Sequence, residues 1–417
     1  MEVLVVGSGG REHSLTWKLK QSPKVSKIYI APGNYGTTNL GTNISAESSE
    51  EIIAWLQKNP VDLVVIGPDQ YLKEGLTDKI RNLGILVFGP SRAAAEIEWS
   101  KTYAKQIMLE ENIPTAQSHT FFNSKEAKQY IRNQKMPIVI KADGLAAGKG
   151  VVIAKTIEEA ESAITNMMDS KIFGDSGNSI LIEEYLDGFE VSAHAFCDGE
   201  EAVLFPVSKD HKRIKDGDIG PNTGGMGTIA PVSTVTKEQI ESIKSKVILP
   251  ILASLKKRGC PFIGILFPGI MLTKNGPFVI EFNARFGDPE TQSYMRILES
   301  DLFEILYACS KGILSSVEVK WNDKYACCIV LAAKGYPIKT ETGDPIVILP
   351  FDSKESLIFY AGTTTSKGQL ITNSGRVLGV TATGDSLNEA LEKAYRRINQ
   401  IDFTGKQYRR DIGTSIQ

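Results

Sequence analysis

Short apolar runs alternate with amphipathic stretches over the first hundred residues. The apolar runs lie at Val3–Val6, Lys27–Ala31, Leu63–Ile66 and Ile85–Phe88. Between two of them, Ser49–Lys58 has a helical pattern, with Ser48 or Ser49 as its N-cap. Buried runs that alternate with helices are typical of a parallel sheet, which binds ligands at the carboxyl ends of its strands. We therefore expect an α/β domain over residues 1–100.

Glycine-rich turns follow the first two of these runs. They read Gly7-Ser-Gly-Gly-Arg-Glu-His13 and Ala31-Pro-Gly-Asn34. A dinucleotide fingerprint needs a third glycine where Glu12 stands and an acidic residue after the second strand, so NAD binding is not expected. Backbone N–H groups at the start of a helix still bind anions, and Arg11 and His13 add charge. A tight turn with solvated charges explains the first motif equally well.

The next section predicts a compact unit of strands and helices. A helix is expected over about 92–112 and carries Lys101. Strands are expected at Ser118–Phe121, Pro137–Lys141, Val151–Ala154 and Ser179–Glu183, and helices at Ser124–Asn133 and Thr156–Met168.

A glycine-rich hairpin joins two of these strands and contains Gly144, Gly148, Lys149 and Gly150. A P-loop would need G-x₄-G-K-[ST] followed by a helix, so this is a different element. Its glycines let backbone amides approach phosphate oxygens, and Lys141 and Lys149 supply charge. We favour phosphate binding over a plain flexible hairpin.

The strand that ends near Glu183 runs into an acidic turn, Ile182-Glu-Glu-Tyr-Leu-Asp-Gly188, with Glu190 two residues later. A strand that leaves its sheet exposes backbone N–H and C=O groups that fit an adenine edge, and a carboxylate accepts from ribose hydroxyls. An acidic hinge is the alternative.

Further on, Asp210, Lys212 and Arg213 precede the loop 220–227. These charged side chains could bind a zwitterion or a phosphate, or they could form a solvated cluster on the surface.

Residues 278–290, Phe-Val-Ile-Glu-Phe-Asn-Ala-Arg-Phe-Gly-Asp-Pro-Glu, begin as a strand. Alternation places Glu281 and Asn283 on one face, about 7 Å apart, with Arg285 next on that face. A carboxylate and an amide oxygen suit Mg²⁺ that also carries phosphates. A solvated edge strand is the alternative.

Other elements are expected at 237–257 (helix), 262–272 (strand), 302–310 (helix), 326–332, 346–349 and 376–383 (strands) and 387–400 (helix).

Composition narrows the function further. The net charge of −2 supplies no basic field for nucleic acid and no polybasic patch for a membrane, so neither partner is expected. The five cysteines contain no C-x-x-C, and the four histidines have no metal-ligand spacing. The first residues predict a strand and not a signal peptide, and we expect a soluble, cytoplasmic protein.

Taken together, the motifs resemble the ATP-grasp superfamily and, more closely, the phosphoribosylamine–glycine ligase family of purine biosynthesis. The resemblance is carried in family order by Gly9–His13, Ala31–Asn34, Val139–Gly150, Asp210–Arg213, Gly220–Gly227, Glu281–Glu290 and Tyr408–Gly413. It implies an α/β and α+β multidomain fold: an N-terminal parallel-sheet domain (1–100), an ATP-grasp domain (101–323) with a mobile lid at about 115–188, and a strand-rich α+β domain (324–417).

The resemblance also implies an activity. ATP, glycine and 5-phosphoribosylamine would give ADP, phosphate and glycinamide ribonucleotide through a glycyl phosphate, with Mg²⁺, or alternatively Mn²⁺, as the metal. The implied metal ligands are Glu281 and Asn283. The implied ATP contacts are Lys101, Lys141, Gly144, Gly148, Lys149, Gly150, Glu183, Glu184, Leu186 and Glu190. Arg285, Asp210 and Lys212 fall in the glycine and acyl-phosphate region, and phosphoribosylamine is expected at Gly9, Gly10, Arg11, Gly33, Asn34 and Asp69.

The chain departs from the family pattern at Asp69, Trp99 and Phe267-Pro268, where the family has Glu, a small residue and Tyr-Ala. The shorter carboxylate at 69 puts its substrate contact in doubt. The alternatives are another ATP-grasp ligase or carboxylase, which the loops at 210–213 and 220–227 disfavour, and a catalytically silent nucleotide-binding protein. Intact Lys141, Glu281, Asn283 and Arg285 disfavour the second. We expect a monomer or weak homodimer.

Overall fold

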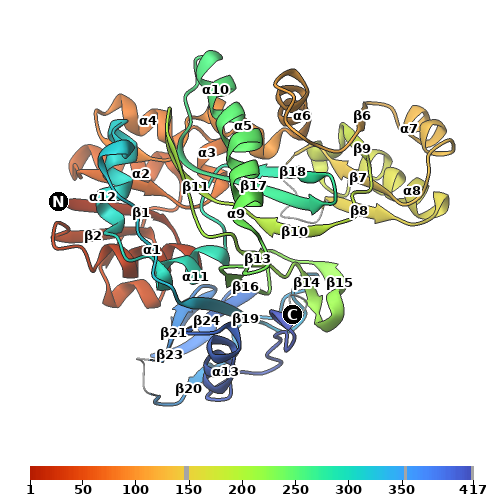
Figure 1. Cartoon of the computed structure of the whole chain (residues 1–417). Helices are drawn as coiled ribbons and strands as arrows, with labels where there is room; N and C mark the ends of the chain where they lie inside the picture. The colour runs from red at the N-terminus through yellow and green to blue at the C-terminus, as the bar shows by residue number, and fades with distance from the viewer. Residues whose placement is uncertain (145–149, 352–354, 415–417) are drawn as a thin grey trace.

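The computed structural model describes residues 1–144, 150–351 and 355–414. Its first sheet has five strands, all parallel, in the order β3-β2-β1-β4-β5 (Figure 1). The strands are β1 (Glu2–Gly7), β2 (Lys27–Pro32), β3 (Thr42–Asn43), β4 (Leu63–Ile66) and β5 (Leu86–Phe88). The predicted N-terminal parallel sheet is therefore confirmed.

Helices join these strands along the chain. They are α1 (Gly10–Leu19), α2 (Ser49–Lys58), α3 (Asp69–Lys73) and α4 (Leu76–Asn82). Ser48 is the N-cap of α2, because its side chain accepts from the N–H of Glu51. Both the bounds and the cap of α2 agree with the prediction.

The single helix expected over about 92–112 is wrong, since two helices form there: α5 (Arg92–Trp99) and α6 (Lys101–Glu110). Ser100 separates them with extended backbone (φ −100°, ψ 95°), and its side chain accepts from the N–H of Tyr103. A serine that caps the second helix offers its backbone an alternative to helix continuation. As a result, Lys101 begins α6.

A four-stranded antiparallel sheet in the order β6-β9-β7-β8 forms the small unit on the right of Figure 1. Its strands and helices are β6 (Ser118–Phe121), β7 (Ile138–Ala142), β8 (Val151–Ala154), β9 (Ile180–Glu184), α7 (Ser124–Ile131) and α8 (Ile157–Ile164). These elements pack on a core of their own that includes Ile131, Ile140 and Ile164. The predicted strands and helices of this unit are confirmed within two residues, except that α8 ends earlier, in a π-helical turn at Thr165–Asp169.

A second antiparallel sheet is centred on the long strand β17 (Ile263–Thr273). It pairs with β10 (Phe189–Ser192), β11 (Ala195–Asp198) and β18 (Gly276–Asn283), and β11 pairs with β12 (Ala202–Leu204). The helix expected at 237–257 is present as α9 (Lys237–Ile243) and α10 (Leu249–Lys257), joined by a π-helical turn at Lys244–Ile248. After β18 come α11 (Glu290–Ile297) and α12 (Leu302–Lys311).

The third sheet joins the middle of the chain to its C-terminal part. It runs β13-β16-β19-β24-β21 and is antiparallel. Its strands are β13 (Lys209–Asp210), β16 (Gly227–Ala230), β19 (Tyr325–Ala332), β21 (Ser356–Tyr360) and β24 (Arg376–Gly384). Helix α13 (Leu387–Ile398) contacts β19 and β24. Small two-stranded pairs complete this part: β14 (Arg213–Lys215) with β15 (Ile219–Asn222), β22 (Thr363–Ser366) with β23 (Gln369–Thr372), and β20 (Val347–Ile348) with β25 (Ile401–Asp402).

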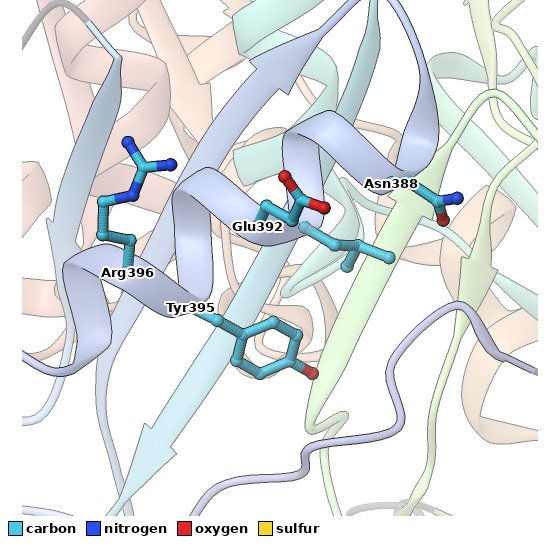
Figure 2. Close-up of a pocket in the computed structure, with 5 residues that line it drawn as sticks. Asn388, Glu392, Tyr395 and Arg396 are labelled. Atoms are coloured by element: carbon cyan, nitrogen blue, oxygen red, sulfur yellow. The ribbon is translucent and has the colours of Figure 1, made fainter.

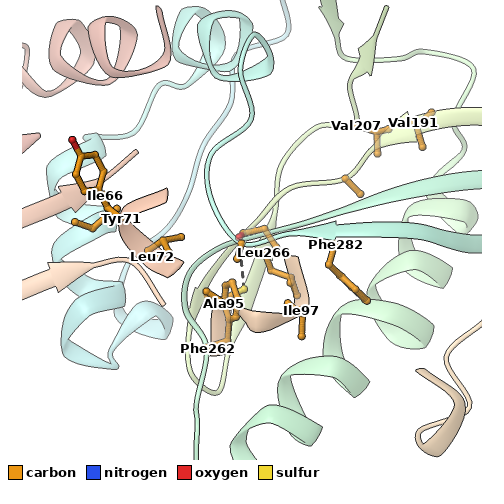
Figure 3. Packing of buried hydrophobic residues seen from close by; sticks show 14 of the residues in the cluster. Ile66, Tyr71, Leu72, Ala95, Ile97, Val191, Val207, Phe262, Leu266 and Phe282 are labelled. Carbon is orange, nitrogen blue, oxygen red and sulfur yellow. Dashed lines mark hydrogen bonds between the residues drawn. The ribbon is translucent and has the colours of Figure 1, made fainter. Parts of the chain in front are cut away.

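The largest hydrophobic core holds the N-terminal sheet against the β17 sheet. Figure 3 shows Ala95 and Ile97 of α5 near Phe262, Leu266 and Phe282. All five cysteines are buried free thiols, as the sequence predicted: Cys197, Cys260, Cys309, Cys327 and Cys328. Within the described ranges, no helix combines the length and apolarity needed to cross a bilayer.

Candidate active site

Charged side chains from several elements gather around strand β18. Glu281 and Asn283 lie near its end, both half-buried, where β18 pairs with Gly269 and Phe267 of β17. Lys141 of β7 donates to the carbonyl of Ile280 at 2.8 Å. This bond fixes the small sheet of residues 118–184 against the strand that carries Glu281.

Glu281 shares a cation with Glu190. Lys212 Nζ lies 3.3 Å from Glu281 Oε1 and 2.5 Å from Glu190 Oε1, so it bridges β18 and β10. Lys212, followed by the more distant Lys141 and Lys101, lowers the pKa of Glu281 to about 2 against the opposing effect of burial. Glu281 is therefore a carboxylate at every pH at which the protein would work.

Asn283 is oriented by Arg285. Arg285 Nη2 donates to Asn283 Oδ1 at 3.0 Å and lies 3.1 Å from Glu98 Oε1. Glu98 Oε2 accepts from the N–H of Ala284 at 2.8 Å. Burial raises the pKa of Glu98 to about 7 although Arg285 is close. Asp69, the first residue of α3, adds its negative field to both Arg285 and Glu98.

The pair Glu281 and Asn283 suits a hard divalent cation. One carboxylate and one amide oxygen are the donors that Mg²⁺ takes when phosphates complete its coordination. Among the described residues, no three His, Cys, Asp or Glu side chains form a metal-binding group. A metal at this strand therefore fits only as one that a phosphate ligand helps to hold.

Glu183 lies deep in the site between two lysines. Its carboxylate is 2.7 Å from Lys141 Nζ and 2.7 Å from Lys105 Nζ, and its exposed fraction is 5%. Burial alone would raise its pKa, but the two lysines outweigh that effect and the pKa is lowered. The side chain of Glu183 is thus committed to holding the lysines. Next to it, Glu184 accepts from the N–H of Gln117 at 2.9 Å, and Leu186 is half-buried.

The start of the glycine-rich hairpin is fixed to helix α6. Lys101 Nζ donates to the carbonyl of Gly144 at 3.0 Å, and Thr102 Oγ1 donates to Asp143 at 2.7 Å. At the other end, the carbonyl of Gly150 accepts from the N–H of Ala142 at 2.8 Å. Gly148 and Lys149 lie outside the described residues. A hollow of about 400 Å³ adjoins the hairpin and is lined by Val151, Arg213, Pro221, Asn222, Pro337 and Ile338.

The N-terminal turn is held mainly by its own residues. Glu12 accepts from the N–H of Gly9 at 2.7 Å and from Arg11 Nε at 2.5 Å. Arg11 also donates to the carbonyl of Phe286 at 3.0 Å and is buried. A methyl group on Gly10 would lie 2.7 Å from Gln292 Nε2, so the turn packs directly against α11.

Asn34 joins three segments of the chain. Its side-chain amide donates to the carbonyls of Ser8 and Tyr360, each at 2.8 Å, and its Oδ1 accepts from the N–H of Gly36. Gly33 has φ +76°, and a side chain there would meet Asn43. Asn34 therefore sets the shape of the turns around Gly9 and Gly33.

Several residues of the site were not singled out from the sequence. They are Glu98 and Lys105, which hold Arg285 and Glu183, and Arg376, which lies 3.2 Å from Asp288. Lys105 stands one helical turn after Lys101, and that i,i+4 spacing was a usable signal. Arg376 and Glu98 gave no local signal, because their partners are far away in the sequence.

Another surface hollow lies away from β18. It measures about 530 Å³ and follows α13, where Asn388, Leu391, Glu392, Tyr395 and Arg396 line it (Figure 2). None of these residues belongs to the charged group around β18, so we do not assign the candidate site to it.

Comparison with known proteins connects this geometry to one family. Three family models match in order: phosphoribosylglycinamide synthetase N domain (residues 1–98), ATP-grasp (A) domain (99–291) and C domain (326–415). The phosphoribosylamine–glycine ligase of Caldanaerobacter subterraneus is 45% identical over 414 residues, covering 99% of both chains. That of Clostridium acetobutylicum is 42% identical over 417 residues, covering 100% of both.

Solved structures with a similar fold include members of the same family. The crystal structure of phosphoribosylamine–glycine ligase from Thermotoga maritima has a TM-score of 0.88 at 35% identity, covering 99% of this chain and 100% of that one. The biotin carboxylase domain of 2-oxoglutarate carboxylase from Hydrogenobacter thermophilus has a TM-score of 0.76 at 16% identity, covering 98% and 91%, and so shares the fold. With matches along nearly its whole length, the chain belongs to the phosphoribosylglycinamide synthetase family of ATP-grasp proteins.

Proposed function

We propose that this chain is an ATP-dependent ligase that joins glycine to 5-phosphoribosylamine, giving glycinamide ribonucleotide, ADP and phosphate. The observation that carries the proposal is the group on β18. An ionised Glu281 lies beside Asn283, with Lys212 and Arg285 as adjacent cations. Such a group neutralises phosphate charge while a carboxylate approaches it.

The reaction has two steps. A glycine carboxylate oxygen attacks the γ-phosphorus of ATP, the bond to the β-γ bridging oxygen breaks, and ADP leaves. The amine of phosphoribosylamine then attacks the acyl carbon, phosphate leaves, and the nitrogen loses a proton. When bound, Mg²⁺ neutralises the charge on the phosphates. Both steps need cations close to the transferred phosphoryl group. Lys212, which pairs with Glu281, and Arg285, which pairs with Glu98, would supply them.

We assign the ATP contacts by position. Lys101 and Lys141 would bind phosphates together with the hairpin at 144–150, and Glu281 and Asn283 would hold Mg²⁺, with Mn²⁺ as the alternative. The edge of β9 around Glu184 and Leu186 would take the adenine, and Glu190 the ribose. Because two lysines hold the Glu183 side chain, its part in this pocket is to fix Lys105 and Lys141.

Phosphoribosylamine would lie at the turns of the N-terminal sheet, against Gly9, Gly10 and Gly33. Arg11, Asn34 and Asp69 would act there mainly by shaping those turns and by orienting Arg285. We also propose domain limits at 100 and 323, a lid at about 115–188, a cytoplasmic location, and a monomer or weak homodimer.

The test is ADP release from Mg²⁺-ATP with glycine, in the presence and absence of freshly generated phosphoribosylamine. We expect ADP only when both substrates are present. Reactions with other amino acids and with ammonia serve as controls. ADP release with another acceptor amine, but none with phosphoribosylamine, would assign the chain a different ligation, and ATP binding without any turnover would make it a silent nucleotide-binding protein.

A further inference from the structure

The motif at residues 408–413 contains a buried charge. Arg409 is 1% exposed, and its guanidinium binds two carboxylates. Nε and Nη2 donate to the two carboxylate oxygens of Asp411, each at 2.7 Å, and Nη1 lies 2.5 Å from Asp218 Oδ1. A buried guanidinium needs such partners, and a two-pronged contact of this kind also fixes its orientation. Arg409 therefore ties the loop between β14 and β15, which carries Asp218, to the end of the chain.

That loop contacts the motif at each of its three residues. Asp216 accepts from the N–H of Arg410 at 2.7 Å, and the N–H of Gly217 donates to Asp411 at 2.8 Å. Asp218 makes the third contact, with the buried guanidinium. The motif thus follows the whole turn of the β14–β15 hairpin, although Gly217 and Asp411 are 194 residues apart in the sequence.

Both neighbours of Lys212 are tied to the same motif. On one side, the N–H of Gly413 donates to His211 Nε2 at 3.1 Å. On the other side, Arg409 Nη1 donates to the carbonyl of Arg213 at 3.3 Å. The backbone of Lys212 is therefore fixed from both directions by residues at the end of the chain.

The imidazole of His211 is neutral and held on both sides. Burial lowers its pKa to about 4. Because Nε2 accepts from Gly413, Nδ1 carries the proton and donates to the carbonyl of Gly227 at 2.9 Å. The N–H of His211 also donates to Asp210 Oδ1 at 2.8 Å. A methyl group on Gly227 would lie 2.9 Å from Ile412 Cδ1, so the motif also packs directly against β16.

The side chain of Lys212 reaches the charged group around β18. Its Nζ contacts Glu190 and Glu281, which lie on two other strands. Its carbonyl accepts from the N–H and the hydroxyl of Thr223, at 2.8 and 2.9 Å. The ammonium meets both carboxylates only while the backbone of Lys212 stays in this place.

We infer that Arg409 is a positioning residue for Lys212 and acts on it from the end of the chain through the β14–β15 hairpin. The inference rests on the proposed function, in which Lys212 supplies charge to the transferred phosphoryl group. A cation displaced by about 1 Å loses much of its effect on a transition state, because the alignment of charges there is exacting. The C-terminal motif thereby contributes to the reaction through the placement of one ammonium.

The first test separates kcat from KM. Arg409→Met should lower kcat for ADP release about tenfold or more and change the KM of ATP less than about twofold, because the charge acts in the transition state. The proposed phosphate contacts Lys101 and Lys141 lie on other elements and stay in place. Arg410→Met is the matched control. This neighbouring arginine is exposed, its guanidinium lies over the ring of Tyr408, and the variant should keep wild-type kinetics.

A double-mutant cycle shows whether the effect passes through Lys212. In a Lys212→Met background, Arg409→Met should lower the single-turnover rate of ADP release by less than about twofold, because the group that it positions is gone. An equal loss in both backgrounds overturns the inference and makes Arg409 a residue of the fold alone. If Arg409→Met does not fold, Asp218→Asn removes the charge of its exposed partner and should show the same dependence on Lys212.

Lysine labelling tests the position of Lys212 without turnover. Acetic anhydride acetylates accessible amines, and mass spectrometry gives the labelling of Lys212 relative to that of the buried Lys105. Arg409→Met should raise this ratio about twofold or more, because the hairpin opens locally, and Arg410→Met should leave it unchanged. An unchanged ratio in the folded Arg409→Met variant overturns the positioning role. A raised ratio, in a protein whose wild type releases no ADP with glycine and phosphoribosylamine, overturns the proposed function alone.

Discussion

Lys212 connects two carboxylates that would otherwise repel each other. Its Nζ contacts Glu190 and Glu281 from separate strands, and the side chain remains 38% exposed. This cation compensates the charge of the two carboxylates, and in the proposed reaction it would also be available to a phosphate. If Glu281 holds a metal as we propose, the metal would share this carboxylate with Lys212.

Glu281→Ala should abolish ADP release while the protein stays folded. The variant removes the one ionised side chain that we assign to the metal, and it also frees Lys212 from one of its two partners. ADP release in the complete reaction, with circular dichroism as a check of folding, measures the effect. Glu318→Ala, which removes an exposed partner of Lys320, is the control and should act normally. Near-normal turnover in Glu281→Ala contradicts the metal assignment.

Lys105→Met should weaken both stability and ATP binding. It leaves Glu183 buried with Lys141 as its remaining cation, which we expect to cost about 1–3 kcal/mol of unfolding free energy. Urea denaturation and the KM of ATP are the measurements. Lys128→Met breaks the more exposed pair with Asp169 and should cost about 1 kcal/mol or less. Equal losses of unfolding free energy in both variants would show that the buried ion pair stabilises the protein no more than the exposed one.

The shared face of the residues on β18 could be predicted from the sequence, whereas their distant partners could not. Strand alternation predicted that Glu281, Asn283 and Arg285 share a face, and Arg285 does contact Asn283. The same reasoning could not supply Glu98 as the residue that holds Arg285, because nothing near Glu98 in the sequence indicates a buried ion pair. Partners brought together by tertiary packing leave no periodic signal.

At the scale of elements, regular segments were predictable and short irregular ones were not. Helix α2 and strand β6 have the predicted bounds. The break at Ser100 was missed because the helical pattern of the sequence continues across it. Strands of two residues, such as β13 and β25, contain too few positions for any period to show.

We predict that the contact between α1 and β21 lowers the stability of the protein at acid pH. His13 Nδ1 accepts from the N–H of Tyr360 at 2.8 Å, and burial lowers the pKa of His13 to about 4. As pH falls, the imidazole of His13 is protonated near pH 6.5 in the unfolded chain but only near pH 4 in the folded chain. The free energy of unfolding that the neutral His13 contributes above pH 6.5 is therefore lost as pH falls toward 4. The loss amounts to about 3 kcal/mol for this group.

His13→Gln keeps an acceptor for Tyr360 but does not titrate. The unfolding free energies of variant and wild type should therefore converge, or reverse, between pH 7 and pH 4, as followed by urea denaturation. His119→Gln serves as the control, since His119 is an exposed residue of β6. A difference between His13→Gln and wild type that does not vary with pH would contradict the assignment.

For the whole molecule, the third sheet explains how the C-terminal part supports the site. Strand β24 begins at Arg376, and its guanidinium contacts Gly224 and Asp288, which come from two different segments of the middle of the chain. The strand-rich C-terminal part was predicted, but its pairing with β16 was not, because β16 is short and follows a glycine-rich loop.

Arg376→Met should therefore lower kcat/KM for glycine about tenfold or more, with a smaller effect on the KM of ATP, since a half-buried guanidinium that holds two segments is lost. Steady-state kinetics with each substrate varied in turn gives the result. Arg396→Met removes an exposed contact with Glu355 and should leave kinetics unchanged. A uniform loss of stability with unaltered kinetics would mean that Arg376 serves the fold alone.

The buried thiols have a practical consequence. Burial raises the pKa of all five cysteines, which are Cys197, Cys260, Cys309, Cys327 and Cys328. Maleimides react with accessible thiolates, so the native chain should label slowly. A single cysteine engineered at an exposed position of the small sheet, such as Ile153, would then carry a fluorophore at one known place without first deleting the natural ones. Energy transfer from such a dye to a fluorescent nucleotide would report the separation of sheet and ligand during turnover.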